Sequence, residues 1–395
     1  RRTPMSRPML NSTAKTDTRG SAAPLLVGLI INPVAGMGGS VGLKGTDGTG
    51  ILQKSIALGA YPLSIPRAAR ALATLFPAAR DICLLVPPNA MGGDALVGFE
   101  FSVEHINHRF GAMSTAADTK SVALAMKGAG VALILFAGGD GTARDLIDAI
   151  GETVPLIGIP CGVKMYSGVF ATSPEAAGHL ARDFLIGLRD TDPTEVMDID
   201  EAAYRAGTLT AQLFGYARCP RTGNRLQGPK AHSVPAHYGA VRSAAEVLVQ
   251  RMESESLYLI GPGTSAKAIV DVAGLSGTLL GVDAMVNKRI VGLDLSATDI
   301  VELTGSKRVY LVLGVIGGQG YVLGRGNQQI PADVIRKAGR DGLLILSSEE
   351  KLSQLVSERL LVDTGDVLLD KELEGFVRVY TGSVRQMMMR LSAGH

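Results

Sequence analysis

Short apolar runs that end in glycine- or proline-rich loops alternate with helix-like stretches through the first half of this 395-residue chain. Buried strands that alternate with helices indicate a parallel sheet with right-handed crossovers. We predict four such strands, within Pro24–Pro33, Asp81–Pro88, Val131–Gly139 and Val154–Pro160. We predict helices between these strands, within Ser64–Ala79, Thr115–Gly130 and Gly141–Glu152. Thr115 is the candidate N-cap of the second helix.

The pattern of the chain changes after about Phe184, where short alternating strands replace the regular order. We therefore predict a disordered tail at 1–23, an α/β domain at 24–188 and a second, mixed α/β domain at 189–395. The tail is polar and could instead resemble an organellar transit peptide, but it has no clear amphipathic helix. The second domain should contain β-rich segments, including a hairpin that turns at Tyr204–Leu209, and its C-terminal end could pack back on the first domain.

The composition limits the classes of partner. Lys and Arg number 39 against 37 Asp and Glu, without a basic cluster, so we expect no nucleic acid partner. No apolar run approaches the roughly 18 residues that cross a bilayer, so we expect no membrane association. Three widely spaced cysteines favour neither a disulfide framework nor a zinc site and are typical of a reducing cytoplasm; they are Cys83, Cys161 and Cys219.

The third apolar run leads directly into the loop Gly-Gly-Asp-Gly-Thr, which contains Asp140. Glycines let the backbone approach a ligand closely, and the N–H groups that open the next helix favour a phosphate. Open α/β sheets bind ligands at the carboxyl ends of their strands. We interpret the loop as a nucleotide-phosphate site with Asp140 aimed at the reacting group; the alternative is that Asp140 is only a helix cap. The other candidate binding residues here are Gly138, Gly139, Gly141, Thr142 and Arg144.

Glycine-rich loops also follow the first and fourth predicted strands. The loop after the first strand has no Walker A sequence but could still wrap a phosphate, the alternative being a flexible surface loop. In the loop after the fourth strand, Lys164 and Ser167 could meet phosphate or substrate. The candidates after the first strand are Asn32, Pro33, Gly36, Gly38, Gly39, Lys44, Gly45, Thr46 and Asp47. Those after the fourth strand are Gly162, Lys164 and Ser167, whereas Cys161 is interpreted as a small buried residue because no histidine or acid lies near it in the sequence.

Two later glycine loops are candidate substrate sites in the second domain. A helix is expected to begin near Thr264, and Arg325 is suited to bidentate contact with phosphate or carboxylate. Asp363 or Asp366 could lie near a metal or could form an Asx turn. No metal-ligating spacing of histidines is found, so no metal ligand is predicted. The substrate candidates are Gly263, Thr264, Ser265, Lys267, Gln319, Arg325 and Asn327.

These loops together resemble those of the NAD kinase, diacylglycerol kinase and 6-phosphofructokinase superfamily. The segments that carry the likeness are "INPVAG", "GGDGT" and "GIPCG". Within that superfamily the chain is most similar to the ATP-NAD kinase-like family, the acetoin catabolism protein X group, from Leu25 to about Thr381; the longer matching phrases are "NPVAGMGGSVGLKGTDG", "GIPCGVKMYSGVFATSPEAAG", "GGQGYVLGRGNQQI" and "LLVDTGD". The resemblance implies a Rossmann-like kinase domain at 24–188 that binds ATP or NAD. It also implies that Asp140 assists attack by the substrate hydroxyl, that Asn32 and Pro33 lie near the phosphates, and that the chain forms a homo-oligomer.

The chain departs from the well-known branches at the acceptor site. We find neither the Asn-Glu pair nor the Thr-Gly-Ser-Thr-Ala-Tyr segment of NAD kinases. Gly162–Tyr166 stands where diacylglycerol and sphingosine kinases have Gly-Thr-Gly-Asn-Asp. The acceptor is therefore left open by the sequence.

We predict an ATP-dependent phosphotransferase resembling NAD kinase, which transfers the γ-phosphate to a hydroxyl of NAD or of a small metabolite. ATP and Mg²⁺ are the expected cofactors, and NAD is a substrate or ligand. Asp140 would accept the hydroxyl proton or bind Mg²⁺, while the glycine-loop N–H groups, Mg²⁺ and Lys44 or Arg144 neutralise phosphate charge. The alternative is a non-catalytic NAD- or nucleotide-binding protein that regulates or accompanies a catabolic dehydrogenase system.

Overall fold

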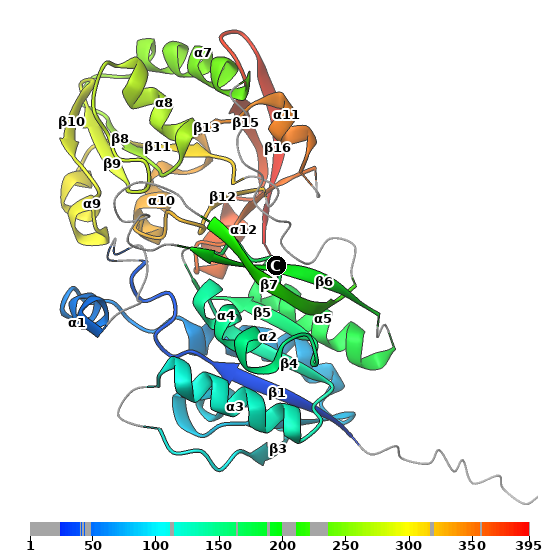
Figure 1. The fold of residues 1–395 in the computed structure, drawn as a ribbon. Coiled ribbons are helices and arrows are strands. Elements are labelled where there is room, and N and C mark those ends of the chain that lie inside the picture. Colours follow the sequence, from blue (N-terminus) through cyan, green and yellow to red (C-terminus); the bar gives the residue numbers. More distant parts are fainter. Residues whose placement is uncertain are drawn as a thin grey trace, which may run out of the picture.

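The computed structural model describes residues 24–39, 41, 43, 49–110, 114–162, 165–187, 190–199, 211–221, 236–316, 320–355 and 358–394. Within these residues the strands form a five-stranded sheet, a nine-stranded sheet and a two-stranded ribbon. Figure 1 shows the blue-to-green part of the chain, with the first sheet, below the yellow-to-red part, with the second. The fold is α/β, as predicted.

The five-stranded sheet is entirely parallel, in the order β3-β2-β1-β4-β5. Its strands are β1 (Leu25–Ile31), β2 (Ile82–Val86), β3 (Ser102–His105), β4 (Leu133–Gly138) and β5 (Leu156–Pro160). Strands β1, β2, β4 and β5 confirm the four predicted buried strands. Ile31 of β1 lies beside Ala137 of β4, and Ala137 lies beside Ile159 of β5, so these three strands end at the same edge.

Helices cover both faces of this sheet, which gives three layers. Helices α2 (Ser64–Leu75) and α5 (Pro174–Ile186) pack on one face, and α3 (Ala116–Gly128) and α4 (Asp140–Ile150) pack on the other. Thr115 caps α3 through a capping box with Asp118, as predicted. The remaining elements of this part are α1 (Thr49–Ala57) and the short 3-10 turns η1 (Phe76–Ala78), η2 (Asn89–Met91) and η3 (Gly93–Leu96).

Strands β6 (Thr191–Ile199) and β7 (Ala211–Pro220) form an antiparallel ribbon that packs on α4. Val196, Ala217 and Cys219 are buried in the same apolar cluster as α3 and α4. The sequence interpretation assigned this ribbon to the second domain, but its apolar side chains bury against the first sheet. The predicted turn at 204–209 lies outside the described residues.

The second sheet is mixed, with the strand order β10-β9-β8-β11-β13-β15-β16-β14-β12. Its antiparallel pairs are β8/β9, β9/β10 and β15/β16, and its other neighbours are parallel. The strands are β8 (Leu257–Ile260), β9 (Asp283–Val286), β10 (Arg289–Gly292), β11 (Val309–Gly314), β12 (Tyr321–Leu323), β13 (Leu343–Leu346), β14 (Leu360–Val362), β15 (Gly375–Tyr380) and β16 (Gln386–Ala393).

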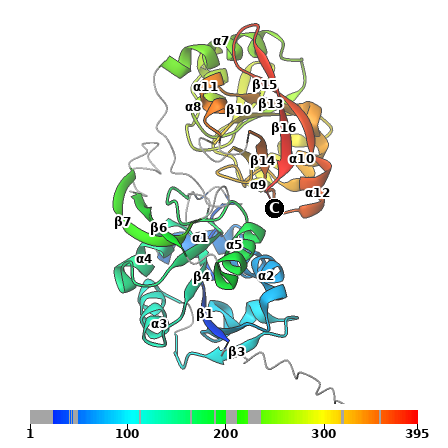
Figure 2. The ribbon, with the colours of Figure 1, turned by 90° about the vertical axis from the view of Figure 1, so that its right-hand side faces the viewer.

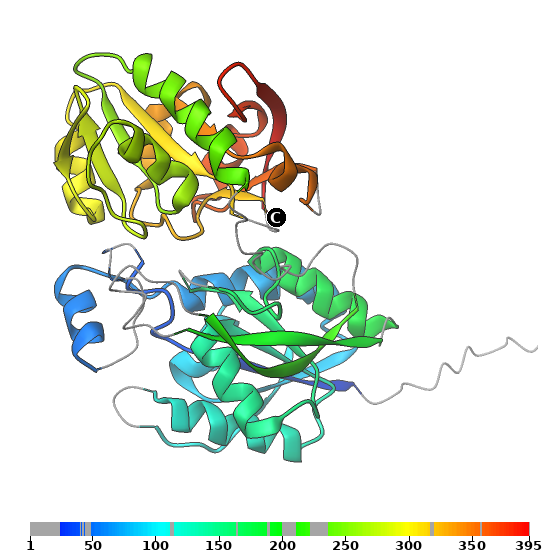
Figure 3. The ribbon, with the colours of Figure 1, turned by 45° about the horizontal axis from the view of Figure 1, so that its top comes forward.

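Helices also cover both faces of the second sheet. Helices α7 (Ala236–Gln250) and α8 (Thr264–Val272) form one apolar cluster with it, and these green helices lie over the sheet in Figure 3. The opposite cluster includes α9 (Ala297–Thr304), α10 (Ala332–Ala338), α11 (Glu349–Ser353) and α12 (Val367–Glu372), with the 3-10 turn η4 (Arg340–Gly342) close by. Figure 2 places α12 and the C-terminus near the junction of the two parts. Among the described residues, no helix combines the length and apolar character needed to cross a membrane.

Candidate functional site

Loops from β1, β4 and β5 meet at the carboxyl edge of the first sheet. The Asn32 Nδ2 atom donates to Thr142 Oγ1 at 3.0 Å, and the Asn32 N–H donates to the Ala137 carbonyl at 2.9 Å. The Cys161 N–H donates to the Gly138 carbonyl at 3.0 Å. These bonds join the first loop to the second and the second to the third, so the structure brings together Asn32, the Gly-Gly-Asp-Gly-Thr loop and Gly162.

The loop after β1 approaches the loop after β5 so closely that it requires glycine. Gly36 has a φ of +81°, and a Cβ atom there would clash with the carbonyl oxygen of Cys161. Glycine tolerates this left-handed backbone without cost, whereas other residues do not. Pro33, Gly38 and Gly39 lie in the same series of turns.

Asp140 is the first residue of α4, and Gly139 is the N-cap. The side chain of Asp140 is nearly buried, and its two carboxylate oxygens accept hydrogen bonds from the backbone N–H groups of Tyr166 (2.7 Å) and Ser167 (2.9 Å). Asp140 is therefore not the N-cap that the alternative interpretation expected: its carboxylate anchors the loop that follows β5.

Ser167 is held from a second direction by the β6–β7 ribbon. Its Oγ accepts the N–H of Met197 at 3.0 Å, and the Gly168 N–H donates to the Glu195 carbonyl at 2.9 Å. The ribbon therefore fixes the middle of the loop that meets Asp140. Ser167 lies in the predicted loop after β5, and its hydroxyl oxygen accepts a hydrogen bond from the backbone of the ribbon.

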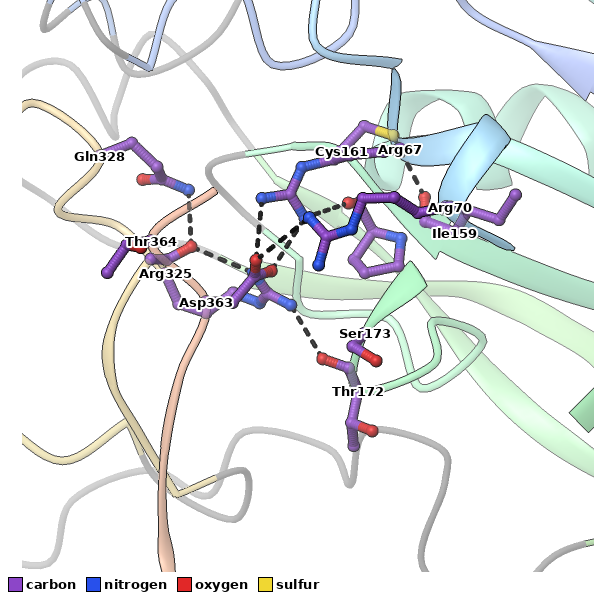
Figure 4. Close-up of polar contacts among 12 residues, drawn as sticks. Arg67, Arg70, Ile159, Cys161, Thr172, Ser173, Arg325, Gln328, Asp363 and Thr364 are labelled. Atoms are coloured by element: carbon purple, nitrogen blue, oxygen red, sulfur yellow. Dashed lines mark hydrogen bonds and ion pairs between the residues drawn. The ribbon is translucent and has the colours of Figure 1, made fainter. Parts of the chain in front are cut away.

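A buried ion cluster joins the two sheets beside this edge. In what we call the Asp363 cluster, the Asp363 carboxylate accepts from Arg67 Nη1 at 2.8 Å and from Arg325 Nη1 at 2.6 Å (Figure 4). Arg67 belongs to α2, whereas Arg325 and Asp363 follow β12 and β14. Burial alone would raise the pKa of Asp363, but the two guanidinium charges hold that pKa well below its usual range.

Both arginines of the Asp363 cluster also bind backbone carbonyls of the first part of the chain. Arg67 donates to the Pro160 carbonyl at 3.0 Å, and Arg325 donates to the Thr172 carbonyl at 2.9 Å. The Arg325 guanidinium lies 4.3 Å from the centroid of the Tyr321 ring, and the Tyr321 hydroxyl also donates to Thr172. Arg325 was predicted to bind a substrate phosphate or carboxylate; in the structure its guanidinium binds the Asp363 carboxylate and the Thr172 carbonyl of the chain itself.

Cys161 is buried beside this cluster, and its thiol is free. Burial raises the pKa of Cys161 to about 12. The thiol is therefore protonated at neutral pH and unsuited to nucleophilic attack. This agrees with the interpretation of Cys161 as a small buried residue.

The other predicted substrate residues lie in the second part of the chain. Gly263 is the N-cap of α8, Thr264 and Ser265 open that helix, and Lys267 pairs with Asp271 one turn later. Asn327 is buried and holds its own loop, because its amide accepts the Gly324 N–H and donates to the Val322 carbonyl.

The remaining predicted residues lie at helices α4 and α12 or outside the described part of the chain. Arg144 lies on α4, half-buried. Asp366 caps α12 and pairs with Arg336. Within the described part of the chain, no three His, Cys, Asp or Glu side chains gather as a metal site. The candidates outside the described residues are Lys44, Gly45, Thr46, Asp47, Lys164 and Gln319.

Sequence reasoning missed Arg67 and Tyr166. Arg67 had a readable signal, because it lies on the face of α2 that also buries Ala71 and Leu75, and a charged residue on an apolar face needs a buried partner. Tyr166 acts through its backbone N–H, and no side-chain pattern could have identified it.

Comparisons with known proteins agree with this arrangement. Residues 27–188 match the family model described as the ATP-NAD kinase N-terminal domain. Residues 253–391 match the ATP-NAD kinase C-terminal domain. A search of curated proteins found no match. The two matched regions contain the first sheet and the second sheet, and the β6–β7 ribbon lies between them.

Proposed function

This chain belongs to the ATP-NAD kinase family, and we propose that it transfers the γ-phosphoryl group of ATP to a hydroxyl of NAD or of a small metabolite. The observation that carries the proposal is the position of Asp140. It opens α4 at the carboxyl end of β4, between loops from β1 and β5 that are bonded to its own loop. Ligands of open α/β sheets bind at this edge.

The chemistry asks mainly for positioning and charge neutralisation. The N–H groups at the start of α4 favour phosphate oxygens, and Gly139, Gly141 and Thr142 would lie around them. Arg144 and Lys44 would supply positive charge. Gly263, Thr264, Ser265 and Lys267 open a second helix and would bind another anionic group of the acceptor or the nucleotide.

Asp140 would accept the proton of the attacking hydroxyl or bind Mg²⁺. The N–H groups of Tyr166 and Ser167 fix its carboxylate in one orientation, which a proton acceptor or metal ligand requires. Kinase sites hold Mg²⁺ through one or two carboxylates together with phosphate oxygens, so Asp140 with ATP is a suitable donor set. The metal would neutralise charge on the phosphates.

A second function is a non-catalytic nucleotide- or NAD-binding protein that regulates or accompanies a dehydrogenase system. One observation favours it: both oxygens of Asp140 already accept backbone hydrogen bonds, so the residue has a structural task without catalysis. The two functions differ in whether ATP is consumed.

The test screens ATP consumption with Mg²⁺ across NAD, polyols and ketones, alongside thermal unfolding with ATP, ADP, NAD and NADP. The kinase proposal expects an acceptor-dependent release of ADP, and ligands that bind the folded chain should raise its melting temperature. Ligand stabilisation without ATP consumption would favour the regulatory function. If none of these ligands raises the melting temperature, neither proposal stands.

A further inference from the structure

Side chains of Arg67, Asp140 and Arg325 bind described residues between Pro160 and Thr172, in addition to the hydrogen bonds that join Cys161, Ser167, Gly168 and Ala171 to neighbouring backbone. Arg67 binds the Pro160 carbonyl at the start of the segment. Asp140 binds the N–H groups of Tyr166 and Ser167 in the middle. Arg325 binds the Thr172 carbonyl at the end. Both outer contacts therefore come from the arginines that share Asp363 (Figure 4).

The loops that carry Arg325 and Asp363 are fixed to each other in the second part of the chain. Gly324 has a φ of +83°, and a Cβ atom there would clash with the Asp363 carbonyl oxygen, so the ends of β12 and β14 are in direct contact. Asn327 closes the loop around Gly324, and the Thr364 side chain and N–H both bind Asp370. Arg325 and Asp363 are therefore held beside each other on the second part of the chain.

Charge makes Asp363 the indispensable member of the cluster. Its carboxylate accepts from both Arg67 and Arg325, and Arg70, which pairs with Glu175, lies 3.9 Å from it. Without this carboxylate two buried guanidinium groups would face each other without compensation. Buried charges of one sign repel strongly at low local dielectric, so the cluster would open.

We propose that Asp363 is a positioning residue for the Asp140 site: by binding Arg67 and Arg325 together, it holds both ends of the 160–172 segment and so keeps the Tyr166 and Ser167 N–H groups on the Asp140 carboxylate. The inference rests on the proposed function for its catalytic consequence. In this arrangement Arg325 and Asp363 couple the second sheet to the carboxyl edge of the first sheet, where Asp140 lies.

The test compares the full-length wild type, Asp363→Asn and Asp283→Asn by amide hydrogen exchange resolved to Tyr166 and Ser167. Asp283 is the matched control, because it is equally buried but its carboxylate bonds to Thr278 and Asp294 beside β9, at the opposite end of the second sheet. We expect about tenfold faster exchange of both amides in Asp363→Asn, and wild-type exchange in the control. Exchange unchanged in Asp363→Asn, or equally raised in Asp283→Asn, would overturn the proposal.

Turnover provides the second readout. With the acceptor found in the screen, Asp363→Asn should lower kcat by about 10-fold to 100-fold with little change in the KM for ATP, as a misplaced catalytic group does. If Asp363→Asn does not fold, Arg325→Lys replaces it, since lysine keeps the charge but cannot bridge Asp363 and Thr172, and the same changes should appear in smaller measure. The exchange measurement needs no turnover, so a wild type that consumes no ATP would defeat the proposed function alone.

Discussion

Asp140 and Asp363 are both nearly buried carboxylates, but they have different partners. Asp140 accepts two backbone N–H groups, whereas Asp363 accepts two guanidinium groups. The first arrangement orients a carboxylate through neutral backbone donors. The second places a fixed negative charge between two fixed positive charges, which suits a joint between two parts of a chain.

The residue scale gives a prediction about pH. The pKa of Asp363 is lower in the folded chain than the value of about 3.9 expected after unfolding, so its ionisation stabilises the fold above that value. The contribution is lost as the pH falls through the folded pKa. At neutral pH, Asp363→Asn should lower the free energy of unfolding by about 3–5 kcal/mol.

Urea denaturation at several pH values measures this effect. The difference between the wild type and Asp363→Asn should be constant at neutral pH and shrink below about pH 4, where the carboxyl of the unfolded chain becomes protonated. A difference that stays the same down to about pH 2 would show that ionised Asp363 does not stabilise the junction.

Sequence reasoning identified the chemistry of single residues better than their partners. The glycines after β1 indicated a close backbone approach, and Gly36 does lie against the Cys161 carbonyl. Arg325 was predicted to contact a substrate anion, and Asp363 was predicted to lie near a metal or in an Asx turn; in the structure the two side chains pair with each other. Neither pattern could reveal that these two side chains meet, because their encounter depends on β12 and β14 lying side by side.

At the scale of elements, the four buried strands of the first sheet were predictable and the edge strand β3 was not. β1, β2, β4 and β5 are apolar runs that end in glycine or proline. β3 is an edge strand with mainly exposed side chains, so it lacks the apolar run that identifies its neighbours. The ribbon was recognised as β structure, but its packing on α4 depends on a contact that the local pattern does not encode.

The contact between the loops of β1 and β5 leads to a prediction about Gly36. Gly36→Ala should strain the backbone and push Cys161 away, which separates two walls of the proposed nucleotide site. ATP binding should weaken by about tenfold, or about 1.4 kcal/mol. Isothermal calorimetry measures this directly.

Gly59→Ala is the matched control for Gly36→Ala. Gly59 has a similar φ of +83°, but a Cβ atom there would meet nothing within 4 Å. It should lower stability through backbone strain and leave ATP affinity unchanged. Equal ATP affinities for the two variants would mean that the loop contact does not shape the site.

At the scale of the whole molecule, the junction between the two sheets makes each dependent on the other. The boundary expected near 188 separates the ribbon from the sheet it covers, since Val196, Ala217 and Cys219 share a cluster with α3 and α4. We propose that the first folding unit extends through β7. The homo-oligomer implied by the family resemblance stays a prediction, which light scattering can test.

Two truncated chains test this boundary. A chain that ends at Arg221 should unfold at a higher temperature and more cooperatively than one that ends at Leu188, because the second exposes apolar surface on α4. Both truncated chains lack Asp363, so the loss of the Asp363 cluster does not contribute to the difference between them. Equal melting curves by circular dichroism would place the boundary before the ribbon.

The central claim is that Asp140 performs chemistry, and the most direct measurement is ATP turnover by Asp140→Asn beside the wild type, with the acceptor identified in the screen. Asparagine keeps the size of the side chain and one acceptor oxygen but removes the charge. Asp148→Asn, on the exposed side of the same helix, is the control. We expect Asp140→Asn to bind ATP like the wild type and to lose about 100-fold or more in kcat, while Asp148→Asn keeps wild-type turnover. Wild-type turnover by a folded Asp140→Asn protein would contradict the claim.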